Sequence, residues 1–416
     1  MPTALITGAT GITGRATVQQ LLKSDQWSRI ITLSRSQQSS HDDPKIQHAT
    51  IDLQGDTKDM ASHLKDVGRV DYVFFCAYLA DPDEGKALEI NGTMLKNFIG
   101  ALRDLGYLES LKRFILVNGL KQYGVHLGVP KMPMVETDTW LEGDPWPPNF
   151  YYEQQRILSA AAAADANLWT WAVTYPQDVI GVAQANFMNL ATALGLYASV
   201  YSSVSPDHEL AFPGCKENYM AFNNWTSAKL HAEFVEWAAL EPKAGNQAFN
   251  VVNGDTESWQ NLWPRLAERY GAKIPQNMFP KEGKYKDFES SYVDMPTPPP
   301  LWYHAEKIGL DPEQVKNDHS YLHQQIDIAK WAERPEVVKK WEELRDKFGL
   351  DQKTWDNATW VFIGFLLGRC YSCVTTMSKA RGLGWKGYQD TWTAFDETLT
   401  ELEDQGILPK ASELRK

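Results

Sequence analysis

Two adjacent tyrosines and an upstream lysine are the residues of this chain best suited to catalysis. The tyrosines are Tyr151 and Tyr152, and the lysine is Lys121. A tyrosine hydroxyl beside a lysine ammonium is a good hydrogen-bond donor to an oxygen that gains negative charge during a reaction. This sequence therefore predicts a site that stabilises a developing oxyanion. An ordinary surface position is the alternative for Tyr151 and for Lys121.

A glycine-rich turn near the N-terminus predicts a dinucleotide site. Residues 7–14 read Thr-Gly-Ala-Thr-Gly-Ile-Thr-Gly, between an expected strand at 3–8 and an expected helix at 13–22. Glycines permit a tight turn and a close approach to a pyrophosphate, which a helix N-terminus then stabilises. A plain turn is the alternative. The expected cofactor contacts are Thr7, Gly8, Thr10, Gly11, Ile12 and Gly14.

The end of the next expected strand, at 29–34, indicates which dinucleotide is bound. Ser34, Arg35 and Ser36 stand where an acidic residue would bind the ribose 2′-hydroxyl of NAD. An arginine instead offers a planar fork to the 2′-phosphate of NADP, so we expect NADP(H). A solvated Arg35 is the alternative. Asp52 ends a third strand and is placed to accept a hydrogen bond from the adenine, or to cap the strand.

Apolar strands alternate with helices through the first part of the chain. Such alternation predicts βαβ units and an α/β fold with a Rossmann-type doubly wound parallel sheet. Lys121 and Tyr151 should meet at the carboxyl edge of this sheet, where ligands bind. We expect an NADP-binding domain over 1–180, with a further sheet contribution near 247–255, and a mainly helical substrate-binding lobe over 181–416. The strands are expected at 3–8, 29–34, 46–53, 72–76, 113–118, 168–175 and 247–252.

Composition argues against several classes of protein. The chain has 416 residues, 43% hydrophobic content and a net charge of −12, with no basic stripe that would bind nucleic acid. The apolar run 360–368 is too short to span a bilayer, and the N-terminus has no signal-peptide pattern. Four cysteines fit a reduced, cytoplasmic setting. Cys370 and Cys373 form a CxxC motif, expected as two thiols on a helix, and no metal site is expected.

Several segments together resemble the progesterone 5β-reductase/iridoid synthase (PRISE) family of atypical extended short-chain dehydrogenases/reductases. Ordinary short-chain dehydrogenases carry a lysine four residues after the catalytic tyrosine, whereas this chain has Gln155 there. The upstream Lys121 followed by Asn-Phe-Tyr-Tyr at 149–152 is specific to the family. The resemblance runs from the N-terminus to about residue 255. Beside the glycine turn, it is carried by residues 72–77, 112–124, 149–152, 170–176, 187–189, 214–216 and 248–255.

The resemblance implies NADPH-dependent reduction of activated C=C bonds in enones and enals. Hydride would reach the β-carbon while Tyr151 holds the carbonyl oxygen as it becomes an enolate and Lys121 tunes the tyrosine. It also implies a small apolar enone-type substrate and suggests a homodimer. Residues 187–188 and 360–365 would line the substrate pocket or pack in the core. Further cofactor contacts are expected at Leu53, Ala77, Asn118, Tyr175, Pro176 and Val179.

Some residues depart from the family pattern. Leu120 replaces an arginine, Gln177-Asp178 replaces Gly-Asn, and Gln155 and Arg156 replace an acidic pair. The stretch 296–333 is also longer than expected. Three alternatives therefore stay open: a carbonyl reductase of the same superfamily, a non-redox step on the same scaffold, and a dinucleotide sensor without chemistry.

Overall fold

A parallel sheet forms the N-terminal part of the molecule. The computed structural model describes residues 2–35, 43–183, 188–280 and 289–415. Among them, seven parallel strands pair in the order β3-β2-β1-β4-β5-β6-β9, which confirms the expected Rossmann-type doubly wound sheet. The strands are β1 (Thr3–Thr7), β2 (Arg29–Ser34), β3 (Ile46–Thr50), β4 (Tyr72–Phe75), β5 (Arg113–Val117), β6 (Thr170–Pro176) and β9 (Gln247–Val251).

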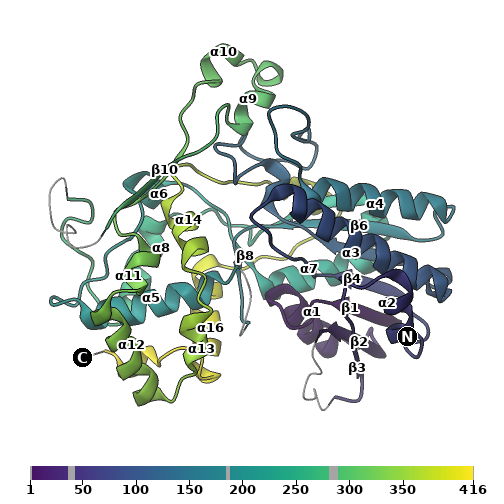
Figure 1. Ribbon diagram of the computed structural model, residues 1–416, viewed down its shortest axis with the longest axis horizontal. Helices are drawn as coiled ribbons and strands as arrows, with labels where there is room; N and C mark the ends of the chain where they lie inside the picture. Colours follow the sequence, from purple (N-terminus) through teal and green to yellow (C-terminus); the bar gives the residue numbers. More distant parts are fainter. Residues whose placement is uncertain (1, 36–42, 184–187, 281–288, 416) are drawn as a thin grey trace.

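Helices cover both faces of this sheet (Figure 1). Along β1, Ala4 and Ile6 enter one apolar cluster and Leu5 enters another, as the two-residue period of a strand requires. The first cluster packs against α1 (Ile12–Lys23) and α7 (Ala228–Leu240). The second packs against α2 (Thr57–Leu64), α3 (Glu84–Asp104) and α4 (Phe150–Ala164). The carboxyl ends of the strands therefore meet between two helical layers.

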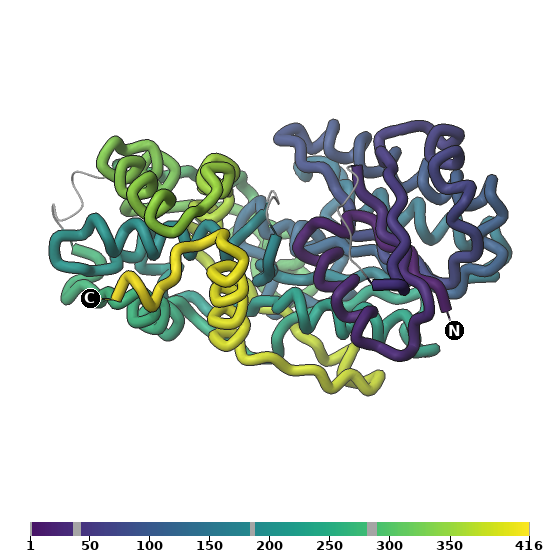
Figure 2. The backbone as a smooth tube through the Cα atoms, turned by 90° about the horizontal axis from the view of Figure 1, so that it is seen from below, coloured from purple at the N-terminus to yellow at the C-terminus, as the bar shows by residue number. Residues whose placement is uncertain are grey.

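The C-terminal part has its own apolar core, built on α5 (Leu190–Val204), α8 (Trp259–Arg269), α14 (Trp360–Gly368) and α16 (Thr391–Asp404). In Figure 2 these helices lie to one side of the N-terminal sheet. This part is mostly helical, as expected, and it also contains one antiparallel pair, β10 (Ser291–Asp294) and β11 (Tyr321–Gln324). No helix in the described ranges is long and apolar enough to cross a membrane.

The remaining elements are short connections and caps. Two short helices, α9 (Pro300–His304) and α10 (Pro312–Val315), lie between β10 and β11 in the sequence. They are found at the top of Figure 1, away from the other helices. The others are β7 (Val179–Ile180), β8 (Thr226–Ser227), α6 (Lys216–Met220), α11 (Ile328–Ala332), α12 (Pro335–Phe348), α13 (Gln352–Asp356), α15 (Ser378–Gly382), η1 (Tyr107–Glu109), η2 (Leu120–Tyr123), η3 (Pro242–Ala244), η4 (Glu306–Ile308) and η5 (Ala411–Glu413).

Residues 369–385, here called the crossing segment, return from the C-terminal core to the sheet (Figure 2). Tyr371 and Cys373 enter the apolar cluster on one face of the sheet, whereas Met377 and Ala380 enter the cluster on the other face. Cys370 and Cys373 therefore lie in extended chain after α14, and the expectation of two thiols on a helix is wrong. Their backbone N–H groups bond to the carbonyls of Tyr321 and Phe222 rather than to a preceding helical turn.

Candidate active site

One asparagine joins the two elements that carry Lys121 and Tyr151. Lys121 lies in η2, directly after β5, and Tyr151 lies in the first turn of α4. The Asn149 side chain donates to the Lys121 carbonyl at 2.7 Å and accepts from the Tyr151 N–H at 3.0 Å. A Cβ on Gly119 would lie 3.1 Å from the Tyr151 hydroxyl, so that hydroxyl lies over the turn after β5. The structure thus brings both predicted residues to the carboxyl edge of the sheet.

The two adjacent tyrosines use their hydroxyls differently. The Tyr152 hydroxyl donates to the Gln122 carbonyl at 2.8 Å and accepts from the Leu141 N–H at 3.1 Å. No residue within the described ranges hydrogen-bonds the Tyr151 hydroxyl, although the Tyr151 side chain is buried. Burial, with smaller contributions from Tyr78 and Glu84, raises the pKa of Tyr151 far above its ordinary value. Tyr151 therefore stays a neutral donor with its proton available for a ligand.

Lys121 forms an ion pair that the sequence did not reveal. Its Nζ lies 2.6 Å from Oε1 of Glu84, in the first turn of α3. Nε2 of His126 lies 3.8 Å from the same carboxylate oxygen. Burial and the positive charge of Lys121 lower the pKa of His126 to about 3, so its imidazole is neutral. Acidic residues are common at helix starts, so the sequence alone did not single out Glu84.

Three buried polar atoms in this region lack hydrogen-bond partners among the described residues. They are the Tyr78 hydroxyl, Oδ1 of Asn118 and Nδ1 of His126. The Tyr78 ring stacks on Phe150 at 6.4 Å, and Asn118 directly precedes Gly119. Buried polar groups in folded proteins are nearly always paired, so these atoms fit a site completed by a bound polar molecule.

Gln155 occupies the position of the lysine in ordinary short-chain dehydrogenases, but it lies in the protein interior. Its Nε2 donates to Oε1 of Gln122 at 2.9 Å, and its Oε1 accepts from the Tyr175 hydroxyl at 2.6 Å. This position therefore joins α4 to β6. The Tyr175 hydroxyl, on a residue expected to contact cofactor, is occupied by this internal bond.

The glycine turn has the shape that a pyrophosphate site needs. Gly8 has φ of +63°, and a Cβ there would lie 3.0 Å from the backbone of Ala77. A Cβ on Gly14 would collide with the Gly8 carbonyl oxygen. Thr7 accepts from the N–H groups of Cys76 and Ala77 at 3.2 and 3.4 Å, which joins the ends of β1 and β4. Because no side chain caps α1 at Gly11, its first N–H groups can bind an anion.

The predicted adenine and ribose contacts lie at the ends of β2 and β3. The Ile51 N–H bonds to the Ser34 carbonyl at 3.0 Å, which sets these two strand ends side by side. Arg35 and Asp52 are both exposed there, and Leu53 is buried. Asp52 follows β3 instead of ending it and accepts from the Gln54 N–H at 3.0 Å. Ser36 lies outside the described residues.

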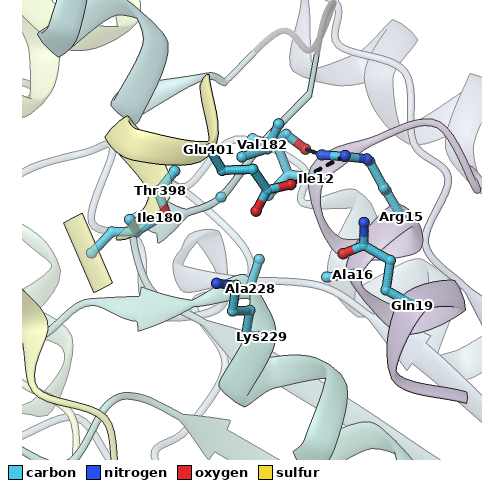
Figure 3. Close-up of a pocket in the computed structure, with 11 residues that line it drawn as sticks. Ile12, Arg15, Ala16, Gln19, Ile180, Val182, Ala228, Lys229, Thr398 and Glu401 are labelled. Carbon is cyan, nitrogen blue, oxygen red and sulfur yellow. Dashed lines mark hydrogen bonds and ion pairs between the residues drawn. The ribbon is translucent and has the colours of Figure 1, made fainter. Parts of the chain in front are cut away.

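Figure 3 shows a pocket between α1, α7, α16 and residues 180–182. Arg15 crosses it, with an ion pair to Glu401 at 3.2 Å and a hydrogen bond to the Val182 carbonyl at 3.4 Å. Ile12 and Thr398 are among the lining residues, and neither Lys121 nor Tyr151 is. Of the predicted cofactor contacts Ile12 alone lines this pocket, so the pocket is distinct from the Tyr151 site.

Gln177 and Asp178, the residues after β6 that depart from the family pattern, contact the crossing segment. The Gln177 side chain donates to the Cys373 carbonyl at 2.6 Å, and Asp178 forms an ion pair with Arg369 at 2.9 Å. Pro176 ends β6 and Val179 begins β7 on either side of these two residues. The altered pair thus attaches the crossing segment to the sheet edge.

The two segments expected to line the substrate pocket lie next to each other. The Asn189 N–H bonds to the Thr359 hydroxyl at 3.2 Å, which joins the start of α5 to the start of α14. Trp360 packs against Trp355 and Trp331, with ring centroids 4.9 and 5.9 Å apart, and so contributes to the C-terminal core. Phe187 lies outside the described residues.

The chain is similar to several known proteins. Residues 4–287 match the family profile described as a PRISE-like Rossmann-fold domain. An uncharacterised protein of Schizosaccharomyces pombe is 36% identical over 98% of each chain. The (S)-8-oxocitronellyl enol synthase of Nepeta racemosa is 32% identical, and the 3-oxo-Δ4,5-steroid 5β-reductase of Arabidopsis thaliana is 27% identical; each match covers 98% of this chain and 93% of the relative.

A solved structure shows the same fold at low identity. The UDP-glucose 4-epimerase of Thermotoga maritima, solved with UDP-glucose, is 14% identical with a TM-score of 0.59. The match covers 97% of this chain and 99% of that chain.

Proposed function

Because the chain belongs to the family of PRISE-like Rossmann-fold proteins, we propose that it is an NADPH-dependent reductase of activated carbon–carbon double bonds. The observation that carries this proposal is the buried Tyr151 side chain near the Lys121–Glu84 ion pair, whose hydroxyl has no hydrogen-bond partner among the described residues. A neutral phenol in a buried site is a strong hydrogen-bond donor to a carbonyl oxygen that becomes an enolate. The names of two relatives, an enol synthase and a reductase of a 3-oxo-Δ4,5-steroid, support the same chemistry.

Tyr151, Lys121 and Glu84 have separate roles in the proposed reaction. NADPH, when bound, supplies the hydride that adds to the β-carbon of the enone. Tyr151 donates a hydrogen bond to the carbonyl oxygen and keeps its proton, because burial raises its pKa. The Lys121 ammonium adds positive charge near that oxygen, and Glu84 fixes where the ammonium lies. Solvent then protonates the α-carbon.

Residues at the carboxyl edge of the sheet would make the cofactor contacts. The uncapped start of α1 and the glycine turn would hold the pyrophosphate. The exposed Arg35 would bind the 2′-phosphate, which favours NADPH over NADH. We propose residues 1–180 as the cofactor part, completed by β9, and residues 181–416 as the part that shapes the substrate pocket.

The test is NADPH oxidation, followed by absorbance, with four compounds: cyclohexenone, a linear enal, a steroid enone and a saturated ketone. We expect oxidation with at least one of the three conjugated compounds, a product two hydrogens heavier with its carbonyl intact, and none with the ketone. Oxidation with the ketone alone would replace the proposal with carbonyl reduction. Tight NADPH binding without turnover on any compound would favour a non-redox step or a sensor.

A further inference from the structure

Two cysteines distant in sequence lie in contact in the C-terminal part of the molecule. Sγ of Cys215, at the start of α6, lies 2.7 Å from Sγ of Cys370, two residues after α14. They are separated by 155 positions in the chain. Cys215 is buried, whereas Cys370 is partly exposed. The fold thus creates a thiol pair that the CxxC motif did not predict.

The second cysteine of the CxxC motif is not part of this pair. Cys373 is fully buried in the apolar cluster against the sheet. Its N–H bonds to the Phe222 carbonyl and to Oδ1 of Asn223. Cys373 therefore packs as a small apolar side chain, and Cys370 has Cys215 as its partner.

We propose that Cys215 and Cys370 are a redox-sensitive pair that forms a reversible disulfide with hydrogen peroxide. A disulfide needs a sulfur separation of about 2.05 Å, so the sulfurs must approach by only about 0.7 Å. Native side chains make such shifts by small χ rotations, without rebuilding the backbone. The proposal does not depend on the reductase function.

The hydrogen bonds around the pair distinguish the two sulfurs. The Asn218 N–H donates to Sγ of Cys215 at 3.3 Å, and the hydrogen bond from the Cys370 thiol is the largest cause that lowers the pKa of Cys215. The same shared hydrogen bond, with burial, raises the pKa of Cys370. Cys215 is therefore the sulfur with more thiolate character, and Cys370 is the proton donor.

The reaction balances with one peroxide molecule. The Cys215 thiolate attacks one peroxide oxygen and the O–O bond breaks, which gives a sulfenic acid and hydroxide. The hydroxide takes up the proton that the Cys215 thiol had released to solvent and becomes the first water. Sγ of Cys370 then attacks the sulfenic sulfur, the S–S bond forms, and the hydroxyl leaves with the thiol proton as a second water. Two thiols are oxidised by two electrons in total and the peroxide is reduced to two waters. A dithiol reductant reverses the change.

The disulfide would link α6 covalently to the crossing segment. Asn218, in α6, already donates to the Arg369 carbonyl at 2.5 Å, and Arg369 reaches Asp178 beside the carboxyl edge of β6. Oxidation would therefore fix the crossing segment, which contacts the carboxyl edge of β6, to α6 by a covalent bond. Closing so long a loop should raise the melting temperature by roughly 5 °C.

The experiment uses the full-length protein, reduced and then treated with a small excess of hydrogen peroxide. We expect a loss of two hydrogens in intact mass, the loss of two titratable thiols, and a proteolytic cross-link between the peptides of Cys215 and Cys370. Dithiothreitol should restore both the thiols and the lower melting temperature. These readouts involve no turnover, so they can fail or succeed independently of the reductase assay.

Serine variants of the three cysteines show which two sulfurs form the disulfide. Cys373→Ser should still form the cross-link, whereas Cys370→Ser and Cys215→Ser should not. A bond between Cys370 and Cys373, or oxygen addition to the thiols without a cross-link, would overturn the proposal. Glu217 lies with these two cysteines in a group whose ligand atoms are within 4.8 Å, so retention of one added zinc ion that blocks both thiols would overturn it in favour of a metal site.

Discussion

The carboxylate of Glu84 holds the ammonium of Lys121 at an Nζ–Oε1 distance of 2.6 Å, so the cation expected to assist Tyr151 is already paired. The side chains of Lys121 and Glu84 are 31% and 22% exposed, so solvent partly screens the pair. In the proposed reaction the lysine would stabilise an enolate, and its position and effective charge would depend on Glu84. Glu84 is thus a positioning residue for the proposed reaction.

Replacement of Glu84 should change turnover more than cofactor binding. Glu84→Ala removes the acceptor that orients Lys121, and we expect kcat on an enone to fall about tenfold. Glu84→Gln should recover part of this loss, because its amide oxygen can accept from the ammonium. Steady-state kinetics test this. Glu89→Gln, an exposed change on the same helix, is the matched control, and equal kcat in Glu84→Ala and the control would remove Glu84 from the mechanism.

Tyr151→Phe and Tyr152→Phe should separate chemistry from stability. The first should lower kcat about 100-fold or more, with the NADPH dissociation constant and the melting temperature nearly unchanged. The second removes a hydroxyl bonded to Gln122 and Leu141 and should lower the free energy of unfolding by about 1–2 kcal/mol. Kinetics and urea unfolding measure both. Reversed behaviour of the two variants would assign the catalytic hydroxyl to Tyr152.

Arg35→Ala should reduce the preference for NADPH. A charge-assisted contact to a phosphate contributes about 1.5–3 kcal/mol, so the NADPH dissociation constant should rise roughly 10- to 100-fold while that of NADH hardly changes. Fluorescence titration with both cofactors measures this. Arg265→Ala, an exposed arginine of α8, serves as the control. An unchanged preference would place phosphate recognition elsewhere.

Acid should destabilise the fold through a buried histidine. His231 is a residue of α7 whose Nε2 lies 3.0 Å from the Thr174 hydroxyl of β6, and burial lowers its pKa from 6.5 to about 3. Above pH 6.5 the imidazole is neutral in both the folded and the unfolded chain. Between pH 6.5 and about 3 only the unfolded chain takes up the proton, so stability falls as pH falls.

One such histidine changes the free energy of unfolding by at most about 1.4 kcal/mol per pH unit. His231→Gln should therefore weaken the decline in urea-unfolding free energy between pH 7 and pH 4. His63→Gln changes an exposed histidine of α2 and should leave the decline intact. Parallel curves for the wild type and His231→Gln would mean that His231 does not couple folding to pH.

The sheet and the glycine turn could be predicted because their signals are local. Each strand is a short apolar run, and Gly8 and Gly14 recur at a fixed spacing before a helix, so neighbouring residues contain the information. The placement of Lys121 and Tyr151 at the same edge of the sheet could be predicted from topology, because Lys121 follows a strand and Tyr151 begins the helix that leads to the next strand. The cofactor and catalytic roles of these residues stay predictions.

The missed features depend on contacts between distant segments. Glu84 reaches Lys121 across 37 positions, and Cys215 reaches Cys370 across 155. The helix expected to carry both thiols of the CxxC motif ends at Gly368, since the following chain bonds to β11 and to the stretch before β8. No periodicity in a single sequence shows which of many polar residues will meet after folding.

The path of the crossing segment also has a consequence for the order in which the protein can fold during synthesis. Trp385 packs against Phe234 with ring centroids 5.1 Å apart, and Met377 belongs to the same apolar cluster as Phe249 of β9. All strands of the sheet leave the ribosome before these residues do, by on the order of ten seconds. During that interval the apolar surface near β9 would lack the cover that Met377 and Trp385 give it in the folded chain.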